Sequence, residues 1–396
     1  MSKITKYPFA QLYDMASGIS STKEQAGHGS PFVSFSTVFN NYFLPDTLPD
    51  LMDTSLKEQE IYSIKQGDIL ITRTSETIYE LAMSCVAAKD YPCATYSGFT
   101  KRLRPKTAGM AYHKYIAFYL RSELFRKAVT NNAFMTLRAS FNEDIFSFLS
   151  LYLPEYKEQV KIGDMLYSME QKIQINKRIC TILESMAKTL YDYWFTQFDF
   201  PDENGKPYRS SGGEMVWNDQ LKREIPKGWA VTTMSALTTV LTGKEDANFS
   251  TPNGNYKFFT CAQETIFCDT PAFSGHAVLI AGNGDFNVKH YTGSFNAYQR
   301  TYVLIPKESK YYAIMYIVAQ QQIQAFKQGS NGSIVKFITK GDVENIPIIL
   351  PDNDVCLDAL NRIFDKIEHC ERENDELTKL RDWLLPMLMN GQAAVE

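Results

Sequence analysis

The stretch QVKIGDMLYSMEQKIQINKRICTILESMAKTLYDYW (residues 159–194) decides the fold, because its apolar residues recur in alternating steps of three and four. A second stretch, LNRIFDKIEHCERENDELTKLRDWLLPML (residues 360–388), has the same spacing. This spacing is the coiled-coil period and predicts two long helices. The first seam is Gln159, Ile162, Leu166, Met169, Ile173, Asn176, Cys180, Leu183, Ala187, Leu190 and Trp194. The second seam is Leu360, Ile363, Ile367, Cys370, Asn374, Leu377, Arg381, Leu384 and Leu388.

The plan of the chain occurs twice. Each helix follows an irregular, β-rich region that closes with an apolar run, at 145–153 and at 346–350, which we expect to be a strand ended by the proline that comes next. Leu183 and Leu377 correspond at an offset of 194 residues (377 − 183). A globular unit followed by a helical spacer, present twice, suits a protein that contacts two separated points on a long ligand. We expect that ligand to be DNA.

Polar residues interrupt both seams. Asn176 and Asn374 stand where apolar side chains are preferred, and Arg381 adds a charge. In coiled coils such residues fix register and partner at some cost in stability. The alternative is a polar contact on a frayed helix face. Because both helices carry such residues, we favour the specification of register or partner.

Composition sets limits on the class of protein. A length of 396 residues predicts two or three domains at about 100–200 residues each. Hydrophobic residues make up 44% and charged residues 22%, which is typical of a globular protein with a core. The net charge of −4 counts against a nucleic-acid partner, since phosphate contacts come mostly from Lys and Arg. A local basic patch on an acidic chain would still allow one.

The cysteines and histidines predict neither disulfides nor a metal site. Seven cysteines is an odd number, and Cys180 and Cys370 sit on the helical seams, where a reduced cysteine packs as a small apolar residue. Cys261 and Cys268 lie too far apart for a zinc knuckle, and the five histidines form no His-x-x-x-His pair. No run of about 18 apolar residues predicts a membrane span, so we expect a cytoplasmic location.

Five regions follow from these patterns. Residues 198–228 are rich in turn formers and read as a linker, although Trp217 predicts that it docks on another part of the chain. The regions are a first globular unit at 1–153, a central helix at 154–197, the linker at 198–228, a second globular unit at 229–350 and a distal helix at 351–396.

Catalytic motifs are missing from the sequence. Gly282-Asn283-Gly284 lacks the third glycine of a dinucleotide loop, since Asn287 stands there, and a tight turn is the better interpretation. His28 beside Ser30 has no acid partner in sequence. There is no phosphate-binding P-loop, no Asn-Pro-Pro-Tyr or Asp-Pro-Pro-Tyr segment of amino-methylating enzymes, and no nuclease core. We therefore expect a chain without a catalytic site of its own.

Residues that could contact DNA occur in both globular units. Thr100–Lys106 carries four cations, and Arg102 and Arg104 share one face of the expected strand. Arg73 is flanked by hydroxyls, a combination that reads a guanine edge or binds phosphate. Each segment alone could be solvated surface, but both units carry them. The candidates are Arg73, Thr74, Lys101, Arg102, Arg104 and Arg138 in the first unit, and Asn283, Gln299, Arg300, Lys327, Asn331 and Lys336 in the second.

The middle of the chain resembles a known family. The residues that carry the likeness are Ile182–Ala187, Leu190, Trp194-Phe195, Phe198–Pro201, Gly205–Tyr208, Ser210–Gly213, Met215-Val216 and Ile225–Trp229. They are similar to the central region of the specificity subunits of type I restriction–modification systems. Gly67–Ile69, Thr72–Glu76 and Ser97–Arg104 resemble one class of target-recognition domain, and Leu279–Gly284 with Ala297–Tyr302 resembles another.

This resemblance implies an α+β fold with two target-recognition domains, two long antiparallel coiled-coil helices and a pseudo-twofold internal repeat. Each domain would read one half of a bipartite DNA site, with the helices as the spacer. A helix of about 36 residues is about 54 Å long, more than one turn of B-DNA. The subunit would have no active site and would recruit two methylation subunits, which use S-adenosylmethionine, and restriction subunits, which use ATP and magnesium. Such a complex methylates adenine at N6 and is an ATP-dependent deoxyribonuclease of a bacterium or archaeon.

The resemblance also implies that the helices bind the methylation subunits. The helix residues expected to take part are Leu166, Met169, Ile173, Asn176, Leu183, Leu190, Trp194, Ile363, Ile367, Asn374, Leu377 and Leu384. Two alternatives remain from the sequence. One is an enzyme that has lost its catalytic half, and the other is a scaffold that binds proteins without reading DNA.

Overall fold

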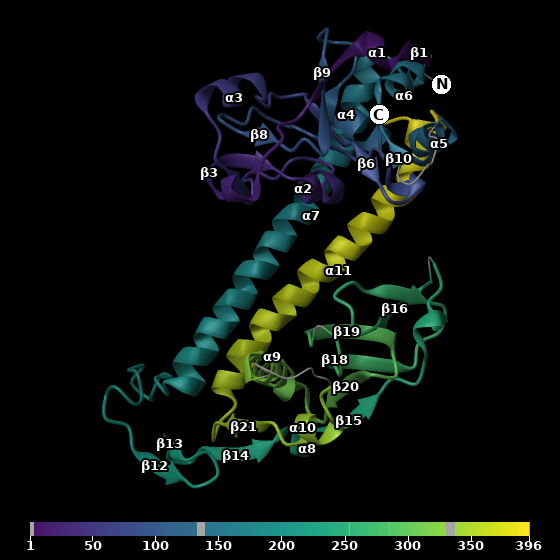
Figure 1. Cartoon of the computed structure of the whole chain (residues 1–396). Coiled ribbons are helices and arrows are strands. Elements are labelled where there is room, and N and C mark those ends of the chain that lie inside the picture. The colour runs from purple at the N-terminus through teal and green to yellow at the C-terminus, as the bar shows by residue number, and fades with distance from the viewer. Residues whose placement is uncertain (1–3, 133–138, 253, 285, 330–336, 396) are drawn as a thin grey trace. The chain divides into compact units, whose positions relative to one another are not determined.

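The computed structural model describes residues 4–132, 139–252, 254–284, 286–329 and 337–395, and at 139 and 326–329 it describes the backbone alone. The chain forms two compact units. Unit 1 is Met1–Gln174 with Asn374–Glu396, and unit 2 is Ile175–Glu373. The long helices α7 (Tyr156–Tyr191) and α11 (Val355–Met389) each contribute residues to both units (Figure 1). The prediction of two long helices is therefore confirmed.

Unit 1 is built around a four-stranded sheet with the order β2-β9-β5-β7. Its strands are β1 (Thr5–Pro8), β2 (Tyr13–Ser17), β3 (Ala26–Val33), β4 (Asp50–Met52), β5 (Ile69–Thr72), β6 (Thr74–Ser75), β7 (Ser84–Val86), β8 (Thr95–Tyr96), β9 (Thr100–Pro105), β10 (Ala139–Ser140) and β11 (Ser150–Leu153). Its other helices are α1 (Phe9–Leu12), η1 (Lys23–Gln25), α2 (Phe35–Asn40), α3 (Leu56–Ile61), η2 (Ile78–Glu80), α4 (His113–Tyr119), α5 (Glu123–Asn132) and α6 (Glu143–Phe148). A smaller sheet, β4-β3-β8, lies beside the core of Val33, Leu70 and Tyr96.

The apolar run at 145–153 is not one strand, as we had predicted. Its first part lies in helix α6, because the Asn142 side chain caps the helix by accepting a hydrogen bond from the backbone N–H of Ile145 at 3.0 Å. Ile145, Phe146 and Leu149 are buried, at the i, i+3 and i, i+4 spacing of one buried helix face, while Phe148 is 78% exposed. Only Ser150–Leu153 forms a strand, β11, paired with β1.

Unit 2 contains a six-stranded sheet with the order β15-β20-β18-β19-β16-β17. Its strands are β12 (Met215–Asn218), β13 (Arg223–Pro226), β14 (Ala230–Thr233), β15 (Thr238–Thr242), β16 (Tyr256–Phe259), β17 (Ile266–Cys268), β18 (Phe273–Ala281), β19 (Val288–Ala297), β20 (Thr301–Pro306) and β21 (Pro347–Leu350). The other helices are a π-helical turn η3 (Asp192–Thr196), α8 (Met234–Leu237), η4 (Ala247–Phe249), η5 (Ser309–Tyr311), α9 (Tyr312–Gly329) and α10 (Lys340–Glu344).

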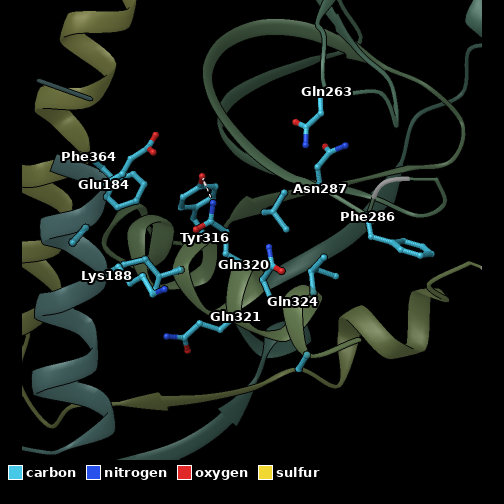
Figure 2. A pocket seen from close by; sticks show the side chains of 15 residues that line it. Glu184, Lys188, Gln263, Phe286, Asn287, Tyr316, Gln320, Gln321, Gln324 and Phe364 are labelled. Carbon is cyan, nitrogen blue, oxygen red and sulfur yellow. Dashed lines mark hydrogen bonds between the residues drawn. The ribbon is translucent and has the colours of Figure 1, made fainter. Parts of the chain in front are cut away.

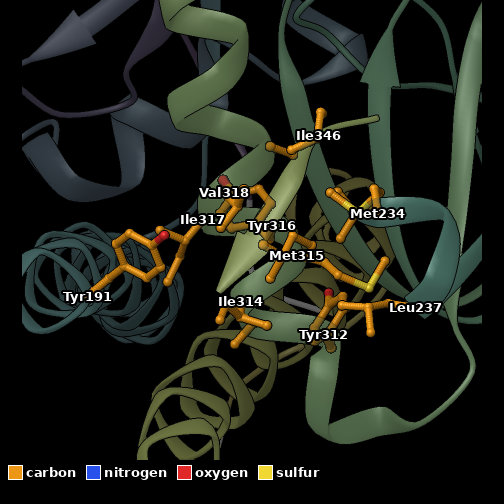
Figure 3. Close-up of a cluster of buried hydrophobic side chains, with 14 of the residues drawn as sticks. Tyr191, Met234, Leu237, Tyr312, Ile314, Met315, Tyr316, Ile317, Val318 and Ile346 are labelled. Atoms are coloured by element: carbon orange, nitrogen blue, oxygen red, sulfur yellow. The ribbon is translucent and has the colours of Figure 1, made fainter. Parts of the chain in front are cut away.

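Helix α9 packs on the sheet of unit 2 and fills its core. Figure 3 shows Ile314, Met315 and Ile317 of α9 among side chains from α8 and from α7. Met234 of α8 is fully buried in the same cluster, and Tyr191 of α7 joins it. Burial of several large apolar side chains supplies the main driving force for docking these helices on the sheet.

The two long helices run antiparallel within each unit. In unit 1 the first half of α7 packs against the end of α11, and the buried residues Leu166 and Leu388 belong to one cluster. In unit 2 the second half of α7 packs against the start of α11, where Ala187 and Leu360 share a cluster. Together with the mixed helix and strand content, this confirms the predicted α+β fold with two antiparallel helices.

Polar seam residues form specific contacts inside each unit. In unit 1 Arg381 makes an ion pair with Glu170 at 2.8 Å, and both side chains are nearly buried. In unit 2 the Asn176 side-chain amide donates a hydrogen bond to the carboxylate of Glu373 at 2.7 Å. Because a buried charge is costly without its partner, these contacts favour one relative position of the two helices.

The internal repeat extends to the register of the strands. In unit 1 β2 pairs with β9 so that Tyr13 faces Pro105, and in unit 2 β15 pairs with β20 so that Thr238 faces Pro306. β1 pairs with β11 as β14 pairs with β21, both antiparallel. The sheet order β2-β9-β5-β7 therefore corresponds to β15-β20-β18-β19.

Candidate nucleic-acid interface

One turn has the same backbone hydrogen bonds in both units. In unit 1 the backbone N–H of Arg73, after β5, donates to the carbonyl of Phe99 at 2.8 Å, just before β9. In unit 2 the N–H of Gly282, after β18, donates to the carbonyl of Arg300 at 2.9 Å, just before β20. These bonds make Phe99 and Arg300 equivalent positions. We call each of these two sites the recognition turn, Ser97–Phe99 in unit 1 and Tyr298–Arg300 in unit 2.

Further hydrogen bonds extend the equivalence. The carbonyl of Arg73 accepts from the N–H of Phe141 at 2.8 Å, and the carbonyl of Gly282 accepts from the N–H of Ile338 at 2.8 Å. Phe141 and Ile338 each stand two residues before a short helix, α6 in unit 1 and α10 in unit 2, and directly before its N-cap residue. The same four segments therefore meet at the same end of the sheet in each unit.

A glycine holds the neighbouring strand against each recognition turn. Gly18 follows β2, and a Cβ at this position would overlap the backbone carbonyl of Ser97. Gly243 follows β15 in the same way, and a Cβ there would overlap the carbonyl of Ala297. The close approach of two backbones explains why a residue without a side chain stands at both places.

Three predicted contact residues lie around the recognition turn of unit 1. Arg73 is exposed, and within the described part of the chain its guanidinium makes no ion pair. Thr74 is half-buried and lines a hollow of about 420 Å³ with Phe35, Phe39, Ser75, Glu76, Glu80 and Phe99. Lys101 donates a hydrogen bond to the Ser17 hydroxyl at 3.0 Å, at the end of β2. Three of the candidates predicted from the sequence therefore lie together at this end of the sheet.

Arg102 and Arg104 lie on one strand face, as predicted, but that face is turned inward. The guanidinium of Arg104 makes two hydrogen bonds with the buried Asp68 carboxylate, at 2.8 and 2.6 Å, and these bonds raise the pKa of Arg104. Both arginines also donate to the carbonyl of Ser63, at 2.7 and 2.9 Å. These contacts hold both guanidinium groups within unit 1, so the geometry lends no support to their predicted contact with DNA.

Gln299 and Arg300 form the tip of the recognition turn in unit 2, and both are exposed. They line a hollow of about 360 Å³ with Thr242, Gly282, Tyr302, Phe337, Ile338, Thr339 and Lys340. Asn283, the third predicted residue, is half-buried and directly follows Gly282. Three of the sequence-predicted residues are thus brought together here, as they are in unit 1.

Four candidates cannot be placed. Arg138, Asn331 and Lys336 lie outside the described residues, and Lys327 lies on α9 at a position where the backbone alone is described. Two other residues beside these sites were not among the candidates predicted from the sequence. Phe99 and Phe337 are 67% and 70% exposed beside the two hollows. Exposed aromatic rings in turns carry no sequence motif, so only their exposure identifies them.

Two stretches of the chain, residues 11–185 and 226–379, match the family described as type I restriction modification DNA specificity domain. Each stretch contains one recognition turn and one long helix or most of it. The chain belongs to this family.

Similarity to known specificity subunits supports the same assignment. The chain is 34% identical over 180 residues to the specificity subunit of the type I restriction enzyme EcoDI from Escherichia coli, which covers 44% of this chain and 40% of that subunit. It is 24% identical over 376 residues to the MjaIX specificity subunit from Methanocaldococcus jannaschii, covering 88% of this chain and 82% of the relative. The crystal structure of a type I restriction–modification S subunit from M. genitalium shares the fold, with a TM-score of 0.59 at 15% identity over 98% of this chain and 96% of that one. The resemblance seen in the sequence is confirmed.

Part of the predicted seam of the two long helices is buried within the chain itself. Leu166, Ile173, Asn176 and Ile367 are buried, so these side chains face the chain's own core rather than a partner surface. The other seam residues that were predicted to bind a partner are half-buried: Met169, Leu183, Leu190, Trp194, Ile363, Asn374, Leu377 and Leu384. Their role in binding a partner stays a prediction.

A second apolar stripe on α7 remains open to solvent. Ile175, Ile179, Ile182 and Met186 are 48%, 38%, 60% and 53% exposed, and they too are spaced by four, three and four residues. We call these four residues the outer stripe. Such spacing suits a further helix packed in coiled-coil fashion. On α11, in unit 1, Leu380 stands 194 residues after Met186 and is 42% exposed, and Trp383 is 65% exposed one turn later.

Unit 2 also contains a polar hollow of about 710 Å³. Figure 2 shows the carboxamides of Gln320, Gln324 and Asn287 among its lining side chains. Burial raises the pKa of Glu184, which also lines it. Carboxamides both donate and accept hydrogen bonds, and Lys188 adds an amine to the lining, so the hollow offers polar groups of several kinds.

Two features are absent from the described residues. None of the described helices is long and apolar enough to cross a membrane. No three His, Cys, Asp or Glu side chains gather there in a way that could hold a metal ion.

Proposed function

We propose that this chain is the DNA-specificity subunit of a type I restriction–modification complex in which each recognition domain reads one half of a bipartite DNA site. The observation that carries the proposal is the duplicated recognition turn, present once in each of the two stretches that match the DNA specificity family. The proposed recognition domains are 1–153 and 229–350. The helices at 154–197 and 351–396 act as the spacer, and residues 198–228 link the two halves.

The proposed DNA contacts lie around the recognition turns. Arg73, Thr74 and Lys101 serve the first half-site. Asn283, Gln299 and Arg300 serve the second. Exposed arginines and lysines in an otherwise acidic chain supply the phosphate contacts, so binding should weaken as salt rises. Arg138, Lys327, Asn331 and Lys336 are further proposed contacts, from the sequence alone.

We further propose that two methylation subunits dock on the long helices. Support comes from the outer stripe, where four large apolar side chains of α7 are exposed at coiled-coil spacing. The corresponding exposed pair on α11, Leu380 and Trp383, offers a second surface, as two copies of one partner require. Restriction subunits complete the complex, which acts on DNA in the cytoplasm.

The chemistry belongs to the partners in this proposal. The methylation subunits bind S-adenosylmethionine and methylate adenine at N6, and the restriction subunits use ATP and magnesium to cleave DNA. This chain is non-catalytic and determines where on the DNA the partner subunits act. Its turns fix which bases are held, and its helices fix which subunits are brought to them.

A methylome tests the reading of DNA. Genomic DNA of the host is sequenced by a single-molecule method with and without the gene for this chain. We expect deletion to remove one bipartite adenine-methylation motif and reintroduction to restore it. A scaffold that does not read DNA would leave every motif unchanged on deletion, which would reject the proposed function.

A double substitution tests the docking surface. Ile182→Glu with Met186→Glu places two charges on the outer stripe without touching a buried side chain, so we expect the chain to fold and to lose the methylation subunit that docks there. The matched control is Lys177→Glu with Thr181→Glu on the same helix, where both side chains are exposed. Co-purification and size-exclusion chromatography measure the complex. Full complex formation by the stripe variant would exclude this docking surface.

A further inference from the structure

The two recognition turns carry opposite chemistry at one backbone position. Phe99 directly precedes β9 and Arg300 directly precedes β20, each the second strand of its sheet, and the carbonyl of each accepts a hydrogen bond from the residue after the neighbouring strand. The next residue repeats as well, since Thr100 faces Thr72 in unit 1 and Thr301 faces Ala281 in unit 2. The scaffold is therefore shared, and the side chain at the tip is what differs.

The surroundings in unit 1 are aromatic. Phe99 is 67% exposed and lines the hollow with Phe35 and Phe39, whose rings stack at 5.9 Å between centroids. A large apolar ring held at a turn costs free energy in water unless a ligand covers it. In the major groove of DNA the apolar feature of a base is the 5-methyl group of thymine.

The surroundings in unit 2 are cationic and polar. Arg300 is exposed, and in the described residues no carboxylate pairs with its guanidinium. Gln299, Thr339 and Lys340 line the same hollow. A guanidinium with its N–H groups available matches the N7 and O6 acceptors of guanine, which it contacts with two hydrogen bonds.

We propose that this tip position selects a base in each half-site, with Phe99 reading the methyl group of a thymine and Arg300 reading the N7 and O6 of a guanine. This inference rests on the proposed function, because it requires that each unit contacts one half-site. The inference adds to the proposed function the residue in each unit that discriminates between bases, and the base that it recognises in each half-site. It also explains why one fold reads two different half-sites, since an exchange of one side chain at a fixed backbone position changes the base that fits.

Base analogues test each contact by removing single atoms. The complex of this chain with its methylation subunits is bound to a duplex carrying the methylome-defined site. Replacing thymine by uracil in the half-site of unit 1 removes only the methyl group, and we expect about 4-fold weaker binding of the unaltered protein, as for one buried carbon. Phe99→Ala should bind the thymine and uracil duplexes equally. Phe148→Ala, which changes another exposed phenylalanine, on α6, is the matched control and should keep the 4-fold preference.

For the second half-site, 7-deazaguanine removes the N7 acceptor and leaves base pairing intact. We expect at least about 5-fold weaker binding by the unaltered protein and no such loss for Arg300→Ala. Arg209→Ala, an exposed arginine outside the recognition turns, should behave as the unaltered protein does.

The outcomes distinguish a failure of the proposed function from a failure of the roles of Phe99 and Arg300. An unaltered complex without a bipartite site would reject the proposed function itself. A complex that binds its site, but in which Phe99→Ala keeps the preference for thymine, would reject only the role of Phe99. A uniform loss of binding over all sequences by Arg300→Ala would make Arg300 a phosphate contact and overturn its part of the proposal.

Discussion

The buried ion pair in the helix pair of unit 1 makes a quantitative prediction. Glu170 and Arg381 lie 2.8 Å apart with side chains 7% and 11% exposed. At an effective dielectric constant of about 20, two unit charges at this distance attract by about 6 kcal/mol. The loss of hydration of both groups offsets much of this attraction. The net contribution is therefore small, whereas the cost of leaving one charge alone is large.

The two partners should respond differently to removal. Arg381 also contacts Asp382 at 2.9 Å and lies over the ring of Tyr42, so it keeps favourable neighbours when Glu170 is replaced. Among the residues that the structure describes, Glu170 would keep only the hydrogen bond from Gln174. We expect Arg381→Met to reduce the free energy of unfolding by about 3–5 kcal/mol and Glu170→Met to reduce it by less.

Replacing both charges completes the cycle. The double variant Glu170→Met with Arg381→Met should be close to the unaltered chain or more stable by about 1–4 kcal/mol. Unfolding by guanidinium chloride, followed by circular dichroism, measures the midpoints. Lys127→Met, which removes an exposed pair with Glu123 on α5, is the control and should leave the midpoint unchanged. Equal small losses in all three helix variants, or a double variant as unstable as Arg381→Met, would refute the reasoning.

Three further predictions concern residues inside the units. Arg104→Ala should lower the stability of unit 1 by leaving the Asp68 carboxylate without its partner and should not change the base preference of the complex, which unfolding curves and methylomes measure. Burial lowers the pKa of His290 to about 4 in the folded chain, against 6.5 ordinarily, so the unfolded chain binds the extra proton. The free energy of unfolding should then fall by up to about 3 kcal/mol between pH 6.5 and pH 4, and His290→Phe should lack this part of the pH dependence in unfolding midpoints. Gly243→Ala should cost about 1–3 kcal/mol, because its Cβ would overlap the Ala297 carbonyl, and a thermal melt equal to that of the unaltered chain would contradict this.

Much of the architecture was predictable from the sequence. The heptad spacing predicted α7 and α11, since alternating steps of three and four have no other common explanation over 30 residues. The repeated plan predicted two globular units. The residues from 182 to 229 carried a likeness to a family, and the matches at 11–185 and 226–379 confirm that the chain belongs to it. These features are local or periodic, so they need no knowledge of which residues meet in space.

The neighbours of each charged side chain needed the structure. Arg104 is part of a basic run in the sequence, but its partner Asp68 lies 36 residues earlier and is buried. Nothing in the local sequence shows that this arginine faces inward. The same holds for the two helix faces, because the seam and the outer stripe have the same spacing, and burial alone shows which of them is inside.

The equivalence of the recognition turns was also decided by tertiary structure. Gly18 corresponds to Gly243, Arg73 to Gly282 and Phe99 to Arg300, at offsets of 225, 209 and 201 residues. Because loops of different length separate these strands, no single alignment offset reveals the match. The sequence by itself determined the helices, the duplication and the family, since periodic burial and local motifs encode them. Only the pairing of distant strands decided that a phenylalanine and an arginine occupy one position, because backbone hydrogen bonds, and not side-chain likeness, define that position.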